Sequence, residues 1–359
     1  MITDKVILVR PYAFNFNIET AGDNVYQVSP KKTSDEEIQG RALKEFDMAV
    51  ETLREKNIQV DVIDDFDDRT PDSIFPNNVF VTFPGKIFVS EMYTDNRNEE
   101  YDKILPQLKK IIDYDKAEII DFRNDEGKVL EGTGALVIDR WNNICYGSLS
   151  KRCDKDEFLK FCKVFDLKPV YFRSKDKGTY IYHTNVMMMV GEKFAIIADD
   201  LIVENKEEVL GSLKESGKEI ISLNQEEFEN FAGNSLELKG KDRNILVMAK
   251  SAYDHLRKEN IEKIEKYDEI LPIDVDTISK YGGGSIRCMI AENFFDIREG
   301  WYGFIKMPGF YNFCHLLARQ VPENYKIYKE DKSWENFLIL LGKILMVIAS
   351  IILAIGVYV

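Results

Sequence analysis

The sequence predicts an α/β fold, and two observations support this class. Short runs rich in β-branched and aromatic residues alternate along the chain with longer amphipathic segments. The chain has 359 residues, of which 45% are hydrophobic, so it can bury a substantial core. No linker rich in Gly or Ser divides residues 1–295, and we therefore expect one large domain over that stretch.

The predicted elements form repeated ββα units of about 50 residues. The clearest helix begins at Ser34, where Glu37 completes a capping-box pattern. The sequence predicts strands over residues 6–11, 59–64, 79–83, 86–92, 136–140, 186–190, 194–200, 244–250 and 269–275. It predicts helices over residues 34–56, 97–112, 154–165, 204–216 and 252–267.

Charge and cysteine content narrow the function classes. Lys and Arg number 48 against 62 Asp and Glu, which gives a formal net charge of −14. No basic run of the kind that neutralises phosphates is present, so we do not expect a nucleic-acid partner. The cysteines are odd in number, lack CxxC spacing and follow no secretory signal. We therefore expect reduced thiols in a cytoplasmic compartment.

The part of the sequence after Phe295 differs in amino-acid composition from the rest. Residues 337–359 are apolar apart from Lys343 and are long enough for a bilayer core of about 30 Å. We expect a domain at 1–296, a connecting segment of uncertain structure at 297–336 and a transmembrane helix at 337–359 that contacts the membrane. A buried helix, or a fused or frame-shifted extension, is the alternative.

Four polar segments interrupt the scaffold and carry the candidate chemistry. They are residues 70–80, 129–140, 182–186 and 282–289. Taken singly, each has an ordinary explanation as a turn, a hairpin loop or a core residue.

Together they supply Cys288, His183 and Glu131, which suit a nucleophile, its base and a carboxylate that orients the base. The thiol is protonated near neutral pH, so a nucleophilic cysteine needs such a partner. We expect an apolar helix after Cys288, whose positive end would lie close to the sulfur.

Several motifs resemble one known superfamily. "VILVRPYAFNFNIETAGDN", "PDSIFPNN", "LEGTGALVIDR", "SLSKRCD", "YHTNVMMMVG" and "GGGSIRCMIAENFF" are similar to the amidinotransferase and arginine-deiminase superfamily, the penteins, and most closely to its citrulline-utilisation hydrolases. The match runs from Val6 to Phe295. It implies a five-bladed α/β propeller of pseudo-fivefold symmetry with a central active site, and no metal or organic cofactor.

The resemblance also implies roles for individual residues. Cys288 would attack the central carbon of a guanidino or ureido group, with His183 as acid and base and Glu131 as its partner. Asp72 would meet the α-ammonium of an amino-acid substrate, and Arg97 and Arg152 would hold its α-carboxylate. A solvated charge at a helix start is the alternative for Arg97. Three further residues match the branch without an assigned role: Asn17, Thr20 and Asn24.

Two asparagines, Asn78 and Asn185, depart from the wider superfamily and bear on the substrate. Asn78 follows Asn77 where arginine deiminases and dimethylargininases carry a second acidic residue, and Asn185 stands where many have aspartate. A guanidinium offers only donors and a positive charge, whereas a neutral ureido group also presents a carbonyl acceptor. The asparagines therefore favour a neutral substrate such as citrulline.

The sequence thus predicts a hydrolase of a linear C–N bond that converts citrulline to ornithine, carbon dioxide and ammonia. Asn78 and Asn185 would orient the ureido group. The alternatives are a deiminase or dihydrolase acting on arginine or a derivative, an amidinotransferase, and a non-catalytic pentein that binds a macromolecule. The sequence leaves the oligomeric state open.

Overall fold

Five sheets with one shared pattern organise the part of the chain that the structure describes. This computed structural model describes residues 1–123 and 127–295, and Met1–Phe295 form one compact unit. In each sheet a central strand pairs antiparallel with one neighbour and parallel with the other. The sheets are β17 (Ala291–Glu292), β1 (Lys5–Arg10) and β2 (Gln59–Asp64); β3 (Phe80–Phe83), β4 (Lys86–Val89) and β5 (Glu118–Asp121); β6 (Leu136–Asp139), β7 (Ile144–Ser148) and β8 (Lys168–Asp176), extended by β9 (Thr179–Tyr180) and β12 (Ile202–Glu204); β10 (Met188–Val190), β11 (Phe194–Ile197) and β13 (Glu219–Ser222); and β14 (Leu236–Leu238), β15 (Ile245–Ala249) and β16 (Glu269–Ile273).

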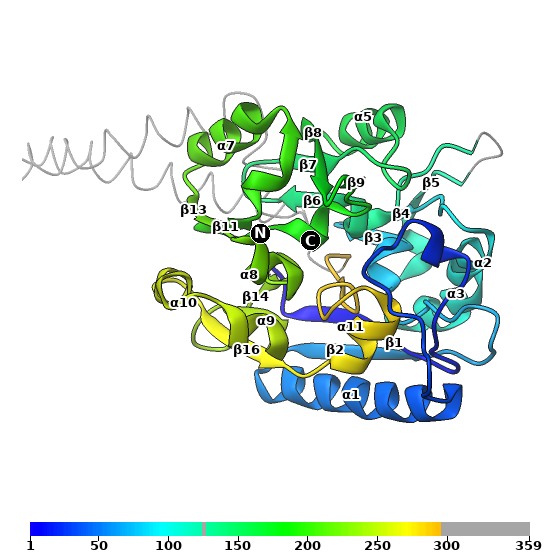
Figure 1. Cartoon of the computed structure of the whole chain (residues 1–359). Helices are drawn as coiled ribbons and strands as arrows, with labels where there is room; N and C mark the ends of the chain where they lie inside the picture. The colour runs from blue at the N-terminus through cyan, green and yellow to red at the C-terminus, as the bar shows by residue number, and fades with distance from the viewer. Residues whose placement is uncertain (124–126, 296–359) are drawn as a thin grey trace, which may run out of the picture. The chain divides into compact units, whose positions relative to one another are not determined.

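A helical connection joins the central strand of each sheet to its parallel neighbour, as parallel pairing requires. Figure 1 shows these helices on the outside of the unit. The repeat is therefore ββαβ, and the mixed α/β class predicted from the sequence is confirmed. The connecting helices are α1 (Asp35–Glu55), α2 (Asp95–Asn98), α3 (Glu100–Ile111), α5 (Lys155–Val164), α7 (Lys206–Glu215), α9 (Lys250–His255) and α10 (Lys258–Glu265).

Shorter helices precede the first strand of several sheets, and η2, α4 and α6 lie in three of the four polar segments. They are η2 (Pro76–Asn78) before β3, α4 (Gly132–Ala135) before β6, α6 (Thr184–Met187) before β10, and α8 (Gln225–Glu229) some way before β14. Short 3-10 turns also occur at η1 (Thr20–Gly22), η3 (Tyr114–Lys116) and η4 (Asp199–Leu201). The candidate residues of different sheets thus occupy corresponding positions in the repeat.

Helix α1 illustrates how local sequence sets an element. Ser34 caps it by accepting a hydrogen bond from the backbone N–H of Glu37 at 3.2 Å. The reciprocal hydrogen bond of a capping box does not form here, since the Glu37 carboxylate pairs with Arg41 one turn later. The predicted face of Ala42, Phe46 and its apolar neighbours is buried against the core.

The helix predicted over 252–267 is broken into α9 and α10. Leu256 and Arg257 both adopt extended backbone conformations between the two helices. The cause is a competing partner, since the backbone N–H and the Nε of Arg257 both donate to the carboxylate of Glu227, at 2.9 and 3.0 Å. Tertiary hydrogen bonding therefore overrides the helical periodicity.

The helix expected after Cys288 is absent from the structure. Cys288 lies in a turn between α11 (Asp276–Gly282) and β17, and its backbone N–H donates to the carbonyl of Ser285. The apolar run that follows pairs with β1 instead, with Ala291 opposite Ile7. The helix expected to place its positive end near this sulfur does not form, and that expectation is wrong.

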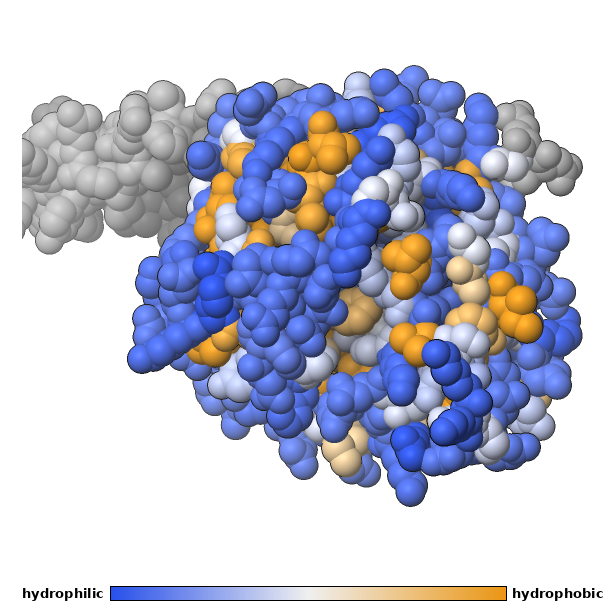
Figure 2. Space-filling model, in the orientation of Figure 1, coloured by the Kyte–Doolittle hydropathy of each residue, from blue (hydrophilic) through white to orange (hydrophobic). Residues whose placement is uncertain are grey.

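Surface features are less distinctive. Figure 2 shows a face on which hydrophilic side chains predominate and hydrophobic ones form small separate groups. Within residues 1–123 and 127–295, no helix has the length and apolar character needed to cross a bilayer. The expected connecting segment at 297–336 and transmembrane helix at 337–359 lie outside the described residues.

Candidate active site

Six of the nine candidate residues line a single small cavity. They come from parts of the chain that are far apart in sequence, and each of the six is buried. The lining comprises Asp72, Asn78, Arg97, Arg152, His183 and Cys288, together with Asn24, Phe75, Tyr182, Gly282 and Gly284. The fold therefore brings the predicted nucleophile and base to one place.

Glu131 lies behind His183 and holds its ring. The Glu131 Oε2 is 2.6 Å from Nε2 of His183, and its Oε1 accepts the backbone N–H of Tyr93 at 2.9 Å. The side chain of Glu131 is fully buried. The pair thus has the arrangement expected of a base and the carboxylate that orients it.

Local charges fix the protonation of this pair. Burial alone would raise the pKa of the Glu131 carboxyl, but Arg152 and His183 outweigh it and hold that pKa well below its usual range. Burial also lowers the pKa of His183 below its ordinary 6.5, although Glu131 opposes this shift. At neutral pH the ring is therefore uncharged, its Nε2–H donates to Glu131, and Nδ1 is free to accept a proton.

Two glycines allow this close packing. A Cβ at Gly134 would lie 2.3 Å from Nδ2 of Asn78 and 2.7 Å from Cε1 of His183. Gly132 has a φ of +39°, and a Cβ there would lie 2.4 Å from the carbonyl oxygen of Asn77. The Gly-Thr-Gly sequence after Glu131 is thus required by the approach of three polar segments.

Arg152 is already engaged by acidic groups. Its Nε and Nη2 donate to the two carboxylate oxygens of Asp23, at 2.8 and 2.6 Å. Its Nη1 lies 3.4 Å from Oε2 of Glu131. Arg152 therefore supports the Glu131 carboxylate directly, a contact that its sequence motif does not reveal.

Arg97 is likewise held within the protein. It forms a bidentate pair with Glu100, at 2.9 and 3.1 Å, and its Nη2 also donates to the carbonyl of Phe75. Its Nη1 donates to Oδ1 of Asn78 at 3.0 Å. Four of its five N–H donors are thereby used. The residue is buried, so it is not the solvated helix-start charge considered as the alternative.

The orientation of the Asn78 amide follows from that contact. Because Oδ1 accepts from Arg97, Nδ2 points the other way, and this buried amino group has no hydrogen-bond partner. Asn78 thus presents an N–H donor beside His183. Asn77 is fully buried with neither side-chain atom hydrogen-bonded, and its side chain is not part of the cavity lining.

Asp72 presents the complementary charge. Its Oδ2 accepts from Nδ2 of Asn17 at 2.8 Å and from the hydroxyl of Thr20 at 3.2 Å. Its Oδ1 is buried without a hydrogen-bond partner. Burial raises the pKa of this carboxyl despite the nearby Arg97. Asn17 and Thr20, which had no assigned role, therefore position Asp72.

Two asparagine side chains contact the sulfur of Cys288. Nδ2 of Asn234 lies 3.3 Å from Sγ, and Nδ2 of Asn185 lies 3.7 Å from it. Asn234 is a residue that sequence reasoning missed. The signal that could have found it is its position directly before β14, which corresponds to that of Asn78 before β3.

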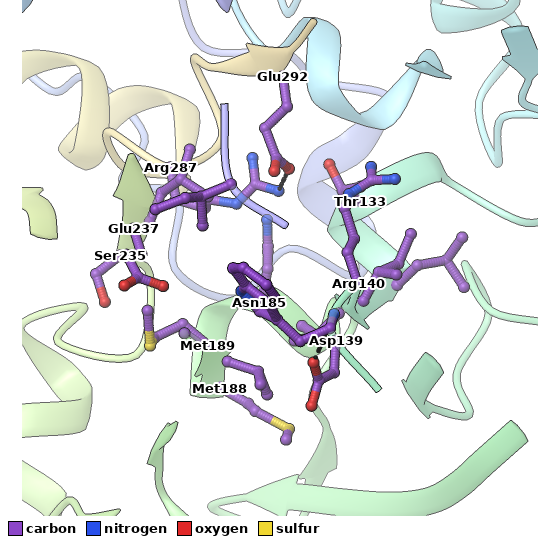
Figure 3. A pocket seen from close by; sticks show the side chains of 18 of the residues that line it. Thr133, Asp139, Arg140, Asn185, Met188, Met189, Ser235, Glu237, Arg287 and Glu292 are labelled. Carbon is purple, nitrogen blue, oxygen red and sulfur yellow. Dashed lines mark hydrogen bonds and ion pairs between the residues drawn. The ribbon is translucent and has the colours of Figure 1, made fainter. Parts of the chain in front are cut away.

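A second cavity lies on the other side of this asparagine pair. Asn185 lines it together with Ser235, as Figure 3 shows, and charged groups surround it. Among these, Arg287 forms an ion pair with Glu292 at 2.9 Å. Asn185 thus separates the cysteine from this second cavity and is not in the lining of the first.

Comparison with known proteins places these observations in a class. The fold and motifs define a pentein, a member of the amidinotransferase and arginine-deiminase superfamily, and homology makes the chain a hydrolase of carbon–nitrogen bonds. More particularly, the chain belongs to the family described as N,N dimethylarginine dimethylhydrolase, eukaryotic, whose model matches residues 10–295. No curated protein sequence matches the chain significantly.

Solved structures share the fold at low sequence identity. The N-terminal domain of ArgZ, an arginine dihydrolase from the ornithine–ammonia cycle in cyanobacteria, has a TM-score of 0.64 at 17% identity, covering 81% of this chain and 98% of that one. Unliganded AgrE has a TM-score of 0.65 at 15% identity, covering 80% and 39%. A dimethylarginine dimethylaminohydrolase adduct with S-methyl-L-thiocitrulline has a TM-score of 0.57 at 14% identity, covering 82% and 100%.

Proposed function

We propose that the protein hydrolyses a C–N bond of a ureido or guanidino amino acid through a covalent intermediate on Cys288, with citrulline as the preferred substrate. The observation that carries this proposal is the meeting of Cys288 and His183 in one buried cavity, with Glu131 bound to the histidine. We further propose that the five sheets form a pseudo-fivefold propeller around this cavity, in keeping with their common strand order.

The first half-reaction uses His183 as base and then as acid. Nδ1 of His183 accepts the thiol proton, directly or through one water, and the thiolate attacks the ureido carbon. The resulting imidazolium is stabilised by ionised Glu131. When the C–N bond breaks, His183 returns the proton to the leaving amine, and ornithine departs. A carbamoyl thioester then remains on Cys288.

The second half-reaction restores the enzyme. His183 is neutral again and takes a proton from water, whose oxygen attacks the thioester carbon. The C–S bond breaks, the sulfur leaves as thiolate and carbamic acid forms, which decomposes to carbon dioxide and ammonia. The proton on His183 then returns to the thiolate.

The Asn78 amide supports a substrate with a carbonyl oxygen. Its Oδ1 is used by Arg97, so the group it offers to the cavity is an unpartnered N–H donor. A ureido carbonyl can accept this hydrogen bond and a developing oxyanion accepts it more strongly, whereas a guanidinium has no acceptor. This donor favours citrulline over arginine.

The other end of the substrate would be an amino acid. The unpartnered Oδ1 of Asp72 suits the α-ammonium, and an ammonium there would compensate the burial of this carboxylate. Arg152 would bind the α-carboxylate in exchange for its contact with Asp23, and Arg97 retains one N–H for the same task. Asn185, whose Nδ2 lies 3.7 Å from Sγ of Cys288, would orient the part of the ureido group that lies next to this sulfur.

Hydrolysis of arginine or a methylated arginine is the second candidate. The family match favours it, since the family is described by activity on dimethylarginine, and the fold is shared with an arginine dihydrolase. The same Cys288, His183 and Glu131 would serve, with a guanidino carbon as the site of attack.

A direct substrate comparison tests both candidates. The purified full-length chain would be incubated separately with citrulline, arginine and dimethylarginine, while ornithine, citrulline and ammonia are measured. Ornithine from citrulline is the expected result. Citrulline or ornithine released from either arginine substrate would support the second candidate, and turnover of none of the three would overturn both.

A further inference from the structure

We propose that Asn234 stabilises the thiolate form of Cys288 and thereby sets the reactivity of this sulfur. This inference deepens the proposed function, and its effect on turnover rests on that function, but its effect on the thiol can be measured without any substrate.

The position of Asn234 is suited to this task. Its Nδ2 lies 3.3 Å from Sγ of Cys288, within the range of hydrogen bonds to sulfur, and the residue is fully buried. Asn185 approaches the same sulfur at 3.7 Å. His183 lines the cavity with Cys288, whereas neither asparagine does. The sulfur therefore has the general base on its cavity side and amide groups away from the cavity.

The orientation of the Asn234 amide is fixed by a second contact. Nδ2 also donates to the backbone carbonyl oxygen of Asn185 at 2.9 Å. If the amide were turned over, Oδ1 would face that carbonyl oxygen and two acceptors would repel each other. One N–H is thus committed to the carbonyl, and the other is directed at the sulfur. Asn234 therefore offers a donor to Cys288 at the shorter distance, 3.3 Å, while its Oδ1 lies 3.6 Å from Sγ, where it can accept from the neutral thiol.

A fixed donor favours the charged sulfur. A thiolate accepts a charge-assisted hydrogen bond, which is stronger than any bond that a neutral thiol makes as acceptor. No helix begins after Cys288 to supply this stabilisation, because the chain forms a turn and then β17 there. The directed amide of Asn234 supplies it instead.

The repeat gives an independent reason to assign a role to Asn234. Asn78, His183 and Cys288 lie in the segments just before the first strands of three sheets, and Glu131 lies in that before a fourth. Asn234 lies in the corresponding segment of the remaining sheet, before β14. Gly233 allows it to reach inward, since a Cβ there would lie 2.6 Å from the backbone of Met187. Each sheet thus contributes a polar residue to the centre.

Alkylation of Cys288 tests the inference. The full-length protein and its Asn234→Ala and Asn234→Asp variants would react with iodoacetamide between about pH 6 and pH 9. Peptide mass spectrometry would follow Cys288 separately from the other cysteines. We expect alkylation of both variants to be about tenfold slower at pH 7, with the difference narrowing toward pH 9 as more of each thiol ionises. In turnover, kcat should fall about tenfold while KM stays constant.

Two controls separate this effect from a loss of structure. Ser235→Ala alters the next residue, whose hydroxyl donates to the carbonyl of Ala232 and does not contact the sulfur. Asn260→Ala removes another buried amide, which is bonded to Glu227 and Ser222. We expect the alkylation curves of both controls to match that of the unaltered protein.

The outcomes are distinct. If the Asn234→Ala protein fails to fold, the nearly isosteric Asn234→Asp protein decides the question. Superimposable curves of alkylation rate against pH for the variants and the unaltered protein would overturn the inference. If the unaltered protein turns over no substrate but its Cys288 loses reactivity in the Asn234 variants, the proposed function fails while the inference stands.

Discussion

The Nε2 atom of His183 and the Oε2 atom of Glu131 lie 2.6 Å apart, and both side chains are buried. Glu131→Gln tests this pair. A glutamine amide can donate to Nε2 and so favours the tautomer with the proton on Nδ1, which cannot act as base. We expect kcat to fall by roughly 10² to 10⁴. Steady-state kinetics would measure the change, and Glu157→Gln, an equally conservative change at a buried site on α5, is the control.

Cys288→Ser should abolish turnover while the fold persists. An alcohol is a far weaker nucleophile than a thiolate at neutral pH, so we expect kcat to fall about a thousandfold or more. Mass spectrometry of acid-quenched reactions should show an adduct on the unaltered protein and none on the variant. Full activity of a correctly folded variant would exclude the covalent mechanism.

The acidic limb of the pH profile should lie below pH 6.5. Burial lowers the pKa of His183 from 6.5, so the neutral, active form persists at lower pH than for a free imidazole. The ionised Glu131 does not limit this range, because its pKa is held below that of a free glutamate. The plot of kcat/KM against pH checks this prediction, and an acidic midpoint above 7 would contradict it.

Asn78→Asp should change substrate preference. The carboxylate would pair with Arg97 and turn an acceptor, not a donor, toward the cavity. We expect kcat/KM for citrulline to fall about a hundredfold and the ratio of arginine to citrulline turnover to rise. Asn57→Asp makes the same chemical change on the surface and should leave both values unaltered. An unchanged ratio in the Asn78 variant would remove the main reason for preferring citrulline.

Ionisation of the buried Asp268 carboxyl should lower the free energy of unfolding of the protein as the pH rises. Burial and the nearby Glu237 raise its pKa from 3.8 to about 8, and its Oδ2 has no hydrogen-bond partner. A raised pKa in the folded state means that stability is fully present below pH 3.8 and is lost progressively as pH rises toward 8.

The Asp268→Asn protein should therefore unfold at nearly the same temperature as the unaltered protein near pH 4 and a few degrees higher at pH 8. Thermal unfolding followed by circular dichroism measures this, with Asp242→Asn on the exposed surface as the control. An equal or lower unfolding temperature of the Asp268 variant at pH 8 would count against the raised pKa.

Much of the fold could be predicted because local patterns set it. The periodicity and cap of α1 gave a helix within a residue of its bounds at each end, and β2 lies where its alternating residues indicated. The break between α9 and α10 could not be predicted, since it depends on Glu227, a residue of another element. Hydrogen bonds between residues distant in sequence cannot be predicted from the pattern of a short stretch of residues.

In the candidate site, too, some residues could be predicted from local sequence and others depend on distant contacts. Cys288, His183 and Glu131 were found because they stand in recognisable polar segments. The bidentate contact of Asp23 with Arg152 joins residues 129 positions apart and was not foreseeable from either motif. Asn234 was missed because its short polar segment resembles an ordinary loop, and only the alignment of five sheets shows that its position recurs.

The pairing of β17 with β1 joins the two ends of the unit and bears on when Cys288 reaches the candidate site. Ala291 is opposite Ile7, so the last strand of the unit is held by its first, and Cys288 precedes that strand by only a short turn. During synthesis the N-terminal strand must wait for nearly the whole domain before it receives this partner. Cys288 can therefore join His183 in the cavity only after nearly the whole unit has been synthesised.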